Sequence, residues 1–250
     1  MTPEFYYLLN VILVSRLLFL PGDTPVPLKA ATLMTLLQIA GLLILQFDYG
    51  LWVLFILLAA FNFGFSLLER KWQNLDVVRL SSLLVNIILA SIFLSQWIGL
   101  EFSYDRIAFL QQLRNYSVLL DWSEKANFSA INVQVMGFLL VINEVNYIIR
   151  YQLRVSKILP HPSASDPESK PNRVSEYRTG KLIGVLERVI IYFLILNNEI
   201  AAIGFVLAAK GLLRFKELEK REFSEFVLIG TLLSALLALL VGSMIKGLLE

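Results

Sequence analysis

Long apolar runs separated by short polar segments dominate the chain. Eight runs stand out, at 5–20, 30–47, 51–68, 80–100, 131–150, 182–196, 200–213 and 226–249. A helix needs about 20 consecutive apolar residues to cross a bilayer core. The pattern therefore predicts an all-α protein, a polytopic membrane helix bundle of about eight membrane helices. The first, sixth and seventh runs are shorter than this length, and the seventh is short enough to be re-entrant.

Two polar segments interrupt this pattern. In 101–129, apolar residues such as Ile107 and Leu110 recur every three or four positions, which predicts an amphipathic helix on the outer face, either a lid or a connector that buries apolar area. The segment 156–180 is rich in Pro and Ser with basic flanks, and we expect a flexible cytosolic linker. The linker separates a five-helix part, 1–155, from a three-helix part, 181–250.

Composition agrees with a membrane protein and excludes several chemistries. Hydrophobic residues make up 57% of the chain and charged residues 17%, with a net charge of only +2, so we expect no nucleic-acid partner. The chain has no cysteine, and its one histidine, His161, lies in the linker. We therefore expect no metal site and no cofactor. No catalytic motif is present, which leaves an enzymatic activity uncertain and disfavoured.

The basic residues predict an orientation. With the N-terminus outside, sixteen of the 22 Lys and Arg residues fall in inner connections and four on the outer side. The remaining two, Arg16 and Arg188, lie inside helices. This positive-inside bias predicts that both termini face outward. The basic inner loops also predict contact with anionic lipid headgroups.

Polar residues inside the runs gather in the cytosolic half of the predicted membrane. Ionisable groups there must pair or be hydrated, so they are candidates for ligand binding. One interpretation is a cytosol-facing cavity for a small solute, ion or lipid headgroup; the other is interhelical hydrogen bonding with snorkelling of Arg16 and Arg188. The candidates are Arg16, Asn62, Asn86, Asn143, Glu144, Asn146, Glu187, Arg188, Lys210, Arg214 and Glu225.

A hairpin is predicted to turn at 197–199, the only polar cluster between two apolar runs. Counting outward from this turn, Glu187 and Lys210 reach nearly the same depth, so we expect a salt bridge. Arg188 lies 100° further round its helix and should point to the N-terminal part, with Glu144 as its counter-ion. Small residues at Gly204, Ala208, Gly211, Gly230, Ser234, Ala238 and Gly242 predict close helix packing.

Three C-terminal stretches carry a resemblance. They are 180–188 (GKLIGVLER), 201–210 (AAIGFVLAAK) and 225–234 (EFVLIGTLLS), with Arg214 and Phe215 between the last two. Together they resemble the C-terminal end of a group of uncharacterised bacterial polytopic membrane proteins, known only as a domain of unknown function. The resemblance covers about the last 70 residues and implies the bacterial cytoplasmic membrane. It implies no reaction, and the N-terminal half is not matched.

Three functions compete on these grounds. The favoured one is a membrane protein that binds a small solute, ion or lipid headgroup in a cytosol-side polar cavity, with transport as its activity. The alternative is a non-catalytic regulatory component that works with a membrane protein partner or as a homo-oligomer. The third is an enzyme that modifies lipid headgroups, since Glu144, Glu187 and Glu225 could supply carboxylates near one plane.

Overall fold

The structure is a computed structural model that describes residues 3–19, 25–72, 74–95, 100–105, 128–156, 171–213 and 221–250. Over these ranges the chain is helical apart from short connections, and an isolated bridge between Leu45 and Phe102 is the one strand-like pairing described. The all-α class is confirmed. The chain divides into two compact units, Met1–Leu139 and Leu140–Glu250.

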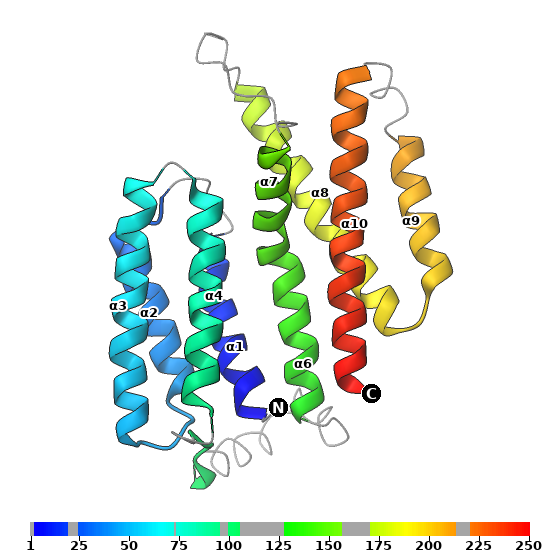
Figure 1. Cartoon of the computed structure of the whole chain (residues 1–250). Helices are drawn as coiled ribbons and strands as arrows, with labels where there is room; N and C mark the ends of the chain where they lie inside the picture. Colours follow the sequence, from blue (N-terminus) through cyan, green and yellow to red (C-terminus); the bar gives the residue numbers. More distant parts are fainter. Residues whose placement is uncertain are drawn as a thin grey trace. The chain divides into compact units, whose positions relative to one another are not determined.

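The first unit is a bundle built around its N-terminal helix. Its helices are α1 (Pro3–Arg16), α2 (Leu28–Leu42), α3 (Tyr49–Lys71), α4 (Leu75–Phe93) and α6 (Phe128–Leu139), and a 3-10 turn, η1 (Leu17–Phe19), follows α1. Helix α1 packs against α2, α4 and α6, while α3 bridges α2 and α4 (Figure 1). Leu8 and Ile12 are almost fully buried, so α1 forms the core of this bundle.

The second unit contains a π-helical segment η3 (Leu140–Glu144), α7 (Val145–Val155), α8 (Pro171–Leu196), α9 (Ile200–Leu213) and α10 (Arg221–Leu249). Helix α8 packs along α10, and η3 contacts both. A Cβ atom added at Gly242 of α10 would lie 2.8 Å from Ile195 of α8. Glycine is therefore required for this close approach, as the small residues of the last run predict.

The turn between α8 and α9 is a Schellman motif. Asn198 has a positive φ of 63°. The amide of Glu199 donates to the carbonyl of Leu194 at 2.8 Å, and the amide of Asn198 donates to Ile195 at 3.0 Å. These bonds satisfy the last carbonyls of α8. Lys246 Nζ donates to the side-chain oxygen of Asn198, so α10 holds the turn that the sequence predicts at 197–199.

Four helical stretches are long and apolar enough to cross a membrane: Tyr49–Lys71, Leu75–Phe93, Phe128–Val155 and Leu228–Leu249. The third runs continuously through α6, η3 and α7. These helices expose large apolar side chains, including Ile56 and Leu84, as expected for surfaces that face lipid. They indicate a membrane protein. The count of about eight membrane helices stays a prediction, and α9, with 14 residues, is short as expected.

The structure changes several predicted boundaries. The fourth helix begins at Leu75, not at residue 80, because Asp76 lies in its first turn, where a carboxylate is favourable. Helix α8 starts at Pro171, so 171–180 is helical rather than linker, consistent with proline at a helix start. The units divide within the fifth run rather than at 155–156. Most of the predicted amphipathic helix, 106–127, and linker residues 157–170 lie outside the described residues.

The left-handed conformation of Asn198 generates a prediction. Replacing Asn198 with Ala should lower the free energy of unfolding by about 1 kcal/mol, because alanine is strained at positive φ and cannot accept from Lys246. Asn198→Gly should lose less, because glycine adopts this conformation freely. Thermal unfolding in detergent measures the difference. Asn197→Ala is the matched control at an exposed position, and an equal loss there would contradict the assignment.

Candidate functional site

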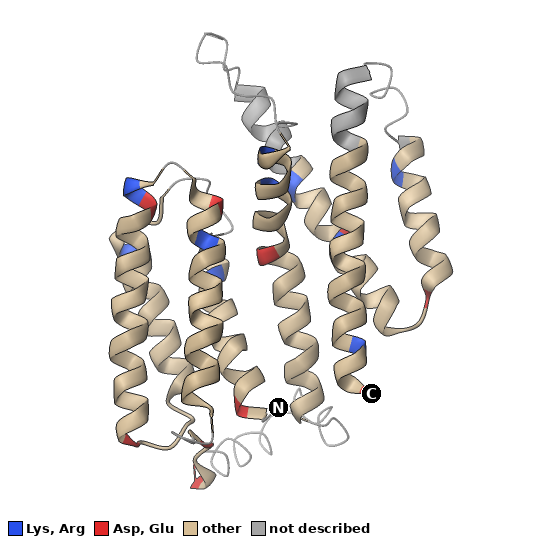
Figure 2. Cartoon of the chain, in the orientation of Figure 1, with Lys and Arg blue, Asp and Glu red and all other residues tan. Residues whose placement is uncertain are grey.

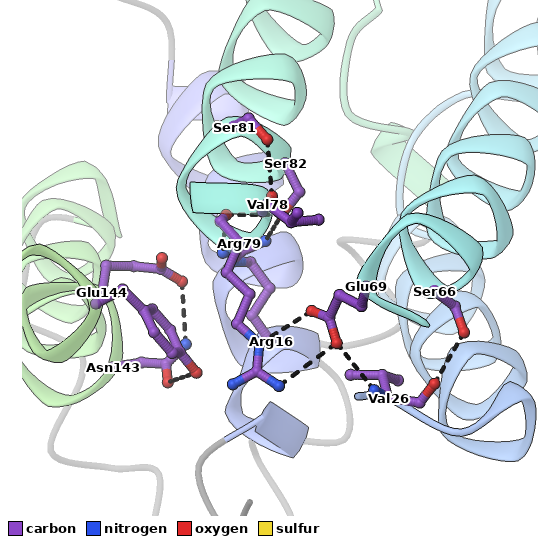
Figure 3. A network of polar contacts seen from close by, with 11 residues as sticks. Arg16, Val26, Ser66, Glu69, Val78, Arg79, Ser81, Ser82, Asn143 and Glu144 are labelled. Atoms are coloured by element: carbon purple, nitrogen blue, oxygen red, sulfur yellow. Dashed lines mark hydrogen bonds and ion pairs between the residues drawn. The ribbon is translucent and has the colours of Figure 1, made fainter. Parts of the chain in front are cut away.

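The first unit holds a buried ion pair between α3 and α4. Arg79 Nε donates to Glu69 Oε1 at 2.9 Å, and the two side chains are 1% and 3% exposed. The other carboxylate oxygen accepts from the backbone amide of Val26 at 2.9 Å. Ser66 Oγ donates to the carbonyl of Val26 at 2.9 Å (Figure 3). Glu69 and Ser66 therefore fix the segment that leads into α2.

Arg16 joins this cluster from the end of α1. Its Nη1 donates to Ser82 Oγ at 2.6 Å, and its Nη2 donates to the carbonyl of Arg79 at 2.8 Å. Ser82 Oγ donates to the same carbonyl at 2.8 Å. Arg16, Glu69, Arg79 and Ser82 are called the N-terminal cluster below. Because the cluster includes ionised groups of both signs, much of its charge is compensated internally, as burial requires.

A second polar chain crosses α1, α2 and α3 deeper in the first unit. Gln38 Nε2 donates to Ser15 Oγ at 2.8 Å, and Asn62 Nδ2 donates to Gln38 Oε1 at 2.7 Å. Asn62 also donates to Thr35 Oγ1 at 3.0 Å. These neutral hydrogen bonds are the interhelical type that holds membrane helices together. These bonds support the interpretation that Asn62 joins helices by hydrogen bonding, and not the interpretation that it lines a cavity.

The side chains of Asn86 and Asn10 use only part of their hydrogen-bonding capacity. Asn86 Nδ2 donates to the carbonyl of Ser82 at 2.8 Å, one turn earlier in α4. Asn10 Nδ2 donates to Asn132 of α6, to its carbonyl at 2.9 Å and to its side-chain oxygen at 3.0 Å. The side-chain oxygens of both Asn86 and Asn10 are buried and accept no hydrogen bond within the described part of the chain.

The second unit places Asn143 and Glu144 at the end of the π segment. Both are 1% exposed, inside the apolar stretch Phe128–Val155. Asn143 Nδ2 donates to Glu144 Oε1 at 3.0 Å, and Tyr147 Oη donates to Asn143 Oδ1 at 3.3 Å (Figure 3). A π-helical turn within an α-helix is often a feature of a functional site. Here it coincides with a buried carboxyl group.

Arg188 of α8 reaches three elements of the second unit. Its Nε donates to the carbonyl of Val141 in η3 at 3.2 Å, and its Nη1 donates to Ser234 Oγ of α10 at 3.2 Å. Its Nη2 donates to Asn146 Oδ1 of α7. Arg188 is 3% exposed. Arg188 contacts the fifth apolar run, as predicted. The prediction that Glu144 is its counter-ion is wrong: among the described residues, the guanidinium group donates to three neutral oxygens.

The predicted pair between α8 and α9 is confirmed. Lys210 Nζ forms an ion pair with Glu187 Oε2, and the side chains are 16% and 17% exposed. Glu187 and Arg188 are adjacent and about 100° apart around the helix, so they contact different neighbouring helices. Glu187 fastens α9, whereas Arg188 fastens η3, α7 and α10.

Lys and Arg lie at the end of α3 and near the start of α4 (Figure 2). Glu144, in the other unit, is the last residue of η3 and lies inside the apolar stretch Phe128–Val155. Trp52 near the start of α3 and Trp72 directly after its end are both more than half exposed. Their separation of 20 residues corresponds to about 30 Å, the thickness of a bilayer core. Tryptophan favours membrane interfaces, and Glu69 lies three residues before Trp72 in the chain.

Sequence reasoning missed Glu69, Ser66 and Ser82, and it placed Arg79 in a loop. One signal was present in the sequence: Asp76, Arg79 and Ser82 recur every three residues and share one face of a helix that starts before Arg79.

Arg214 lies outside the described residues, and Glu225 lies in α10 with its side chain not described. The described residues contain no group of three or more potential acidic, cysteine or histidine metal ligands.

The N-terminal cluster generates a stability prediction. Glu69→Gln should lower the free energy of unfolding by about 3 to 5 kcal/mol, because a buried ion pair loses the negative charge that faces the Arg79 guanidinium at 2.9 Å. Thermal unfolding in detergent provides the measurement. Glu101→Gln is the matched control, since it is the same substitution at an exposed position. Equal melting temperatures for the two variants would refute a stabilising role for the pair.

The Glu187 and Lys210 pair is tested by exchanging its charges. Glu187→Lys and Lys210→Glu should each cost about 1 to 3 kcal/mol of stability, less than a fully buried pair because both side chains are partly exposed. The double exchange should recover at least half of the combined loss. A double-mutant cycle by thermal unfolding measures the recovery. Simple additivity of the two losses would show that the contact contributes nothing.

Comparison with known proteins adds no relative: no family model, curated protein or solved structure matches the chain. The resemblance of the last 70 or so residues to uncharacterised bacterial membrane proteins therefore stays a prediction. The function has to be argued from the helices and their buried polar groups.

Proposed function

We propose that the protein is an integral membrane protein that binds a small polar solute or ion at Asn143 and Glu144, and that transport is its activity. The observation that carries this proposal is a buried carboxyl group at a π-helical turn in the stretch Phe128–Val155. An ionisable residue inside a membrane span is expensive and is typical of solute or proton pathways. The π turn supplies the local irregularity that such sites often use.

Depth supports Glu144 over the N-terminal cluster as the binding residue. Glu144 lies six residues before Arg150, about 9 Å from it along the helix, and sixteen residues after Phe128, about 24 Å away. Glu69 and Arg79 instead lie near Trp72 and the basic end of α3, where water is close. Their bonds to Val26 and Ser82 give them a structural role. Glu144 is thus the described carboxyl group best placed for exchange inside the apolar layer.

The side chains of Asn143 and Glu144 favour a cationic or hydrogen-bond-donating ligand. A carboxylate and an amide oxygen are hard oxygen acceptors, which suit a proton, a small cation or an ammonium group. Binding such a ligand at Glu144 would neutralise charge in the low-dielectric region and so favour movement across it. A lipid headgroup that carries an amine offers the same chemistry from the bilayer.

A non-catalytic, partner-dependent component is the second candidate, and one observation favours it. Cβ atoms added at Gly204 and Gly211 of α9 would meet nothing within 4 Å. These two glycines are therefore not used for close packing within the described chain, although small residues usually permit close helix contacts. A partner helix or a second copy would use them.

We further propose the bacterial cytoplasmic membrane, multi-pass insertion and outward-facing termini. The supporting observation is the distribution of Lys and Arg, which follows the positive-inside rule. Under this orientation the basic ends of α3 and α7 face the cytosol and contact anionic lipid headgroups.

Glu144→Gln tests the proposed site. In proteoliposomes with imposed gradients of sodium, potassium, methylammonium or protons, the wild-type protein should carry at least one of them. The variant should lose about tenfold or more of that flux, because the amide keeps the volume but cannot exchange a charge. Its melting temperature should stay close to that of wild type, since Asn143 can still donate to the remaining oxygen.

Glu199→Gln is the control, the same substitution at an exposed position in the turn before α9. It should leave flux unchanged. Full flux in the Glu144 variant would exclude the site. Absence of flux for every probe in the wild-type protein would contradict transport and favour the partner-dependent function.

A further inference from the structure

We infer that Arg188 is a positioning residue that clamps the π-helical turn and thereby sets the direction in which Asn143 and Glu144 point. The clamp is defined by three contacts of one guanidinium group, to the carbonyl of Val141, to Asn146 Oδ1 and to Ser234 Oγ. Its consequence for binding rests on the proposed function, whereas the clamp itself does not.

The geometry of a π turn explains why a donor is needed there. A π turn pairs residues five apart instead of four, so it accommodates one extra residue within a helix. Where the ladder returns to α-helical pairing, a carbonyl of the wide turn has to find a donor other than the usual amide. Arg188 Nε supplies a donor to Val141 inside Leu140–Glu144.

The second contact holds the far end of the same turn. Asn146 lies two residues after the π segment, and the Arg188 fork binds both its side chain and the Val141 carbonyl. Asn146 Nδ2 in turn donates to the carbonyl of Ile142 at 2.7 Å. Guanidinium and amide together therefore occupy backbone oxygens at Val141 and Ile142, within the turn that carries Asn143 and Glu144.

The third contact anchors the clamp to the bundle. Ser234 lies on α10, which packs along α8, so the guanidinium is held from a helix outside the π turn. Only arginine offers a planar fork that can reach three separate acceptors at once; lysine concentrates its donors on one nitrogen. Adjacent Glu187, which pairs with Lys210, places a negative charge near the fork without occupying it.

Loss of the clamp has a defined structural result. If the wide turn reverts to α-helical pairing, the helix on one side of it rotates by about 100° relative to the other, the angle of one residue. Asn143 and Glu144 lie at this junction, so their side chains would change face. Arg188 therefore controls which face of the helix presents the carboxyl group, without itself touching a ligand.

Hydrogen exchange of the full-length protein in detergent tests the clamp. Arg188→Lys keeps the charge but loses the fork, and amides of 140–146 should exchange about tenfold faster or more, with smaller changes elsewhere. Ser234→Ala removes the anchor alone, leaves the contacts to Val141 and Asn146 in place, and should accelerate exchange of 140–146 less than Arg188→Lys does. Unchanged exchange at 140–146 in the Arg188 variant would overturn the proposal, as would an equal acceleration by Ser234→Ala.

A milder variant covers the case in which Arg188→Lys does not fold. Asn146→Ala should accelerate exchange within 140–146 while α8 and α10 stay protected. Where both variants fold, the double variant should exchange no faster than Arg188→Lys alone, because the two residues act through one contact. Additive acceleration, or none in the Asn146 variant, would refute a shared clamp.

Flux measurements keep this inference separate from the proposed function. If Glu144→Gln abolishes flux and Arg188→Lys both loosens 140–146 and lowers flux, the clamp positions the binding group. If exchange responds as expected while neither variant changes flux, the clamp stands and the proposed binding site falls.

Discussion

An ionised group removed from water must be compensated by the protein itself, and the described buried polar residues obey this constraint in two ways. In the first unit a carboxylate pairs with a guanidinium, so Glu69 compensates Arg79 at 2.9 Å. In the second unit, Arg188 is surrounded by neutral oxygens from three elements. The first solution suits a fixed junction, because a buried ion pair tolerates little change in geometry.

The neutral oxygens around Arg188 hold their guanidinium group differently. Dipolar oxygens hold a guanidinium less strongly than a carboxylate does, and each can accept from another donor or from water. The backbone carbonyl and the amide lie on one continuous helical stretch, η3 with α7, whereas the hydroxyl lies on α10. The arrangement therefore responds to movement of either helix. The unit that carries the proposed binding group is thus the one held together by exchangeable contacts.

Periodicity and charge counting predicted the helical class, the short α9, the turn at Asn198 and the Glu187 to Lys210 pair, because each depends on spacing along the chain. They did not find Glu69, because a carboxylate at the end of an apolar run looks like a loop residue until its partner is known. The pairing of Arg188 with Glu144 was wrong for a related reason. Depth can be counted from the sequence, but the choice between a carboxylate and a carbonyl of the same helix depends on side-chain direction. The π turn has no signature in residue spacing that distinguishes it from an α-helical turn.

The positions of the contacts along the chain bear on how the protein is made. Every residue of the N-terminal cluster precedes residue 83, and Asn10 finds Asn132 within the same unit. Arg188, by contrast, depends on Ser234, and the turn at Asn198 depends on Lys246, both of which lie in α10. During synthesis from the N-terminus, every residue of the N-terminal cluster is present before α10 is made, while α8 and α9 are made before the α10 residues that hold them. The contacts of Arg188 with Ser234 and of Asn198 with Lys246 are therefore among the last to become possible as the chain is made.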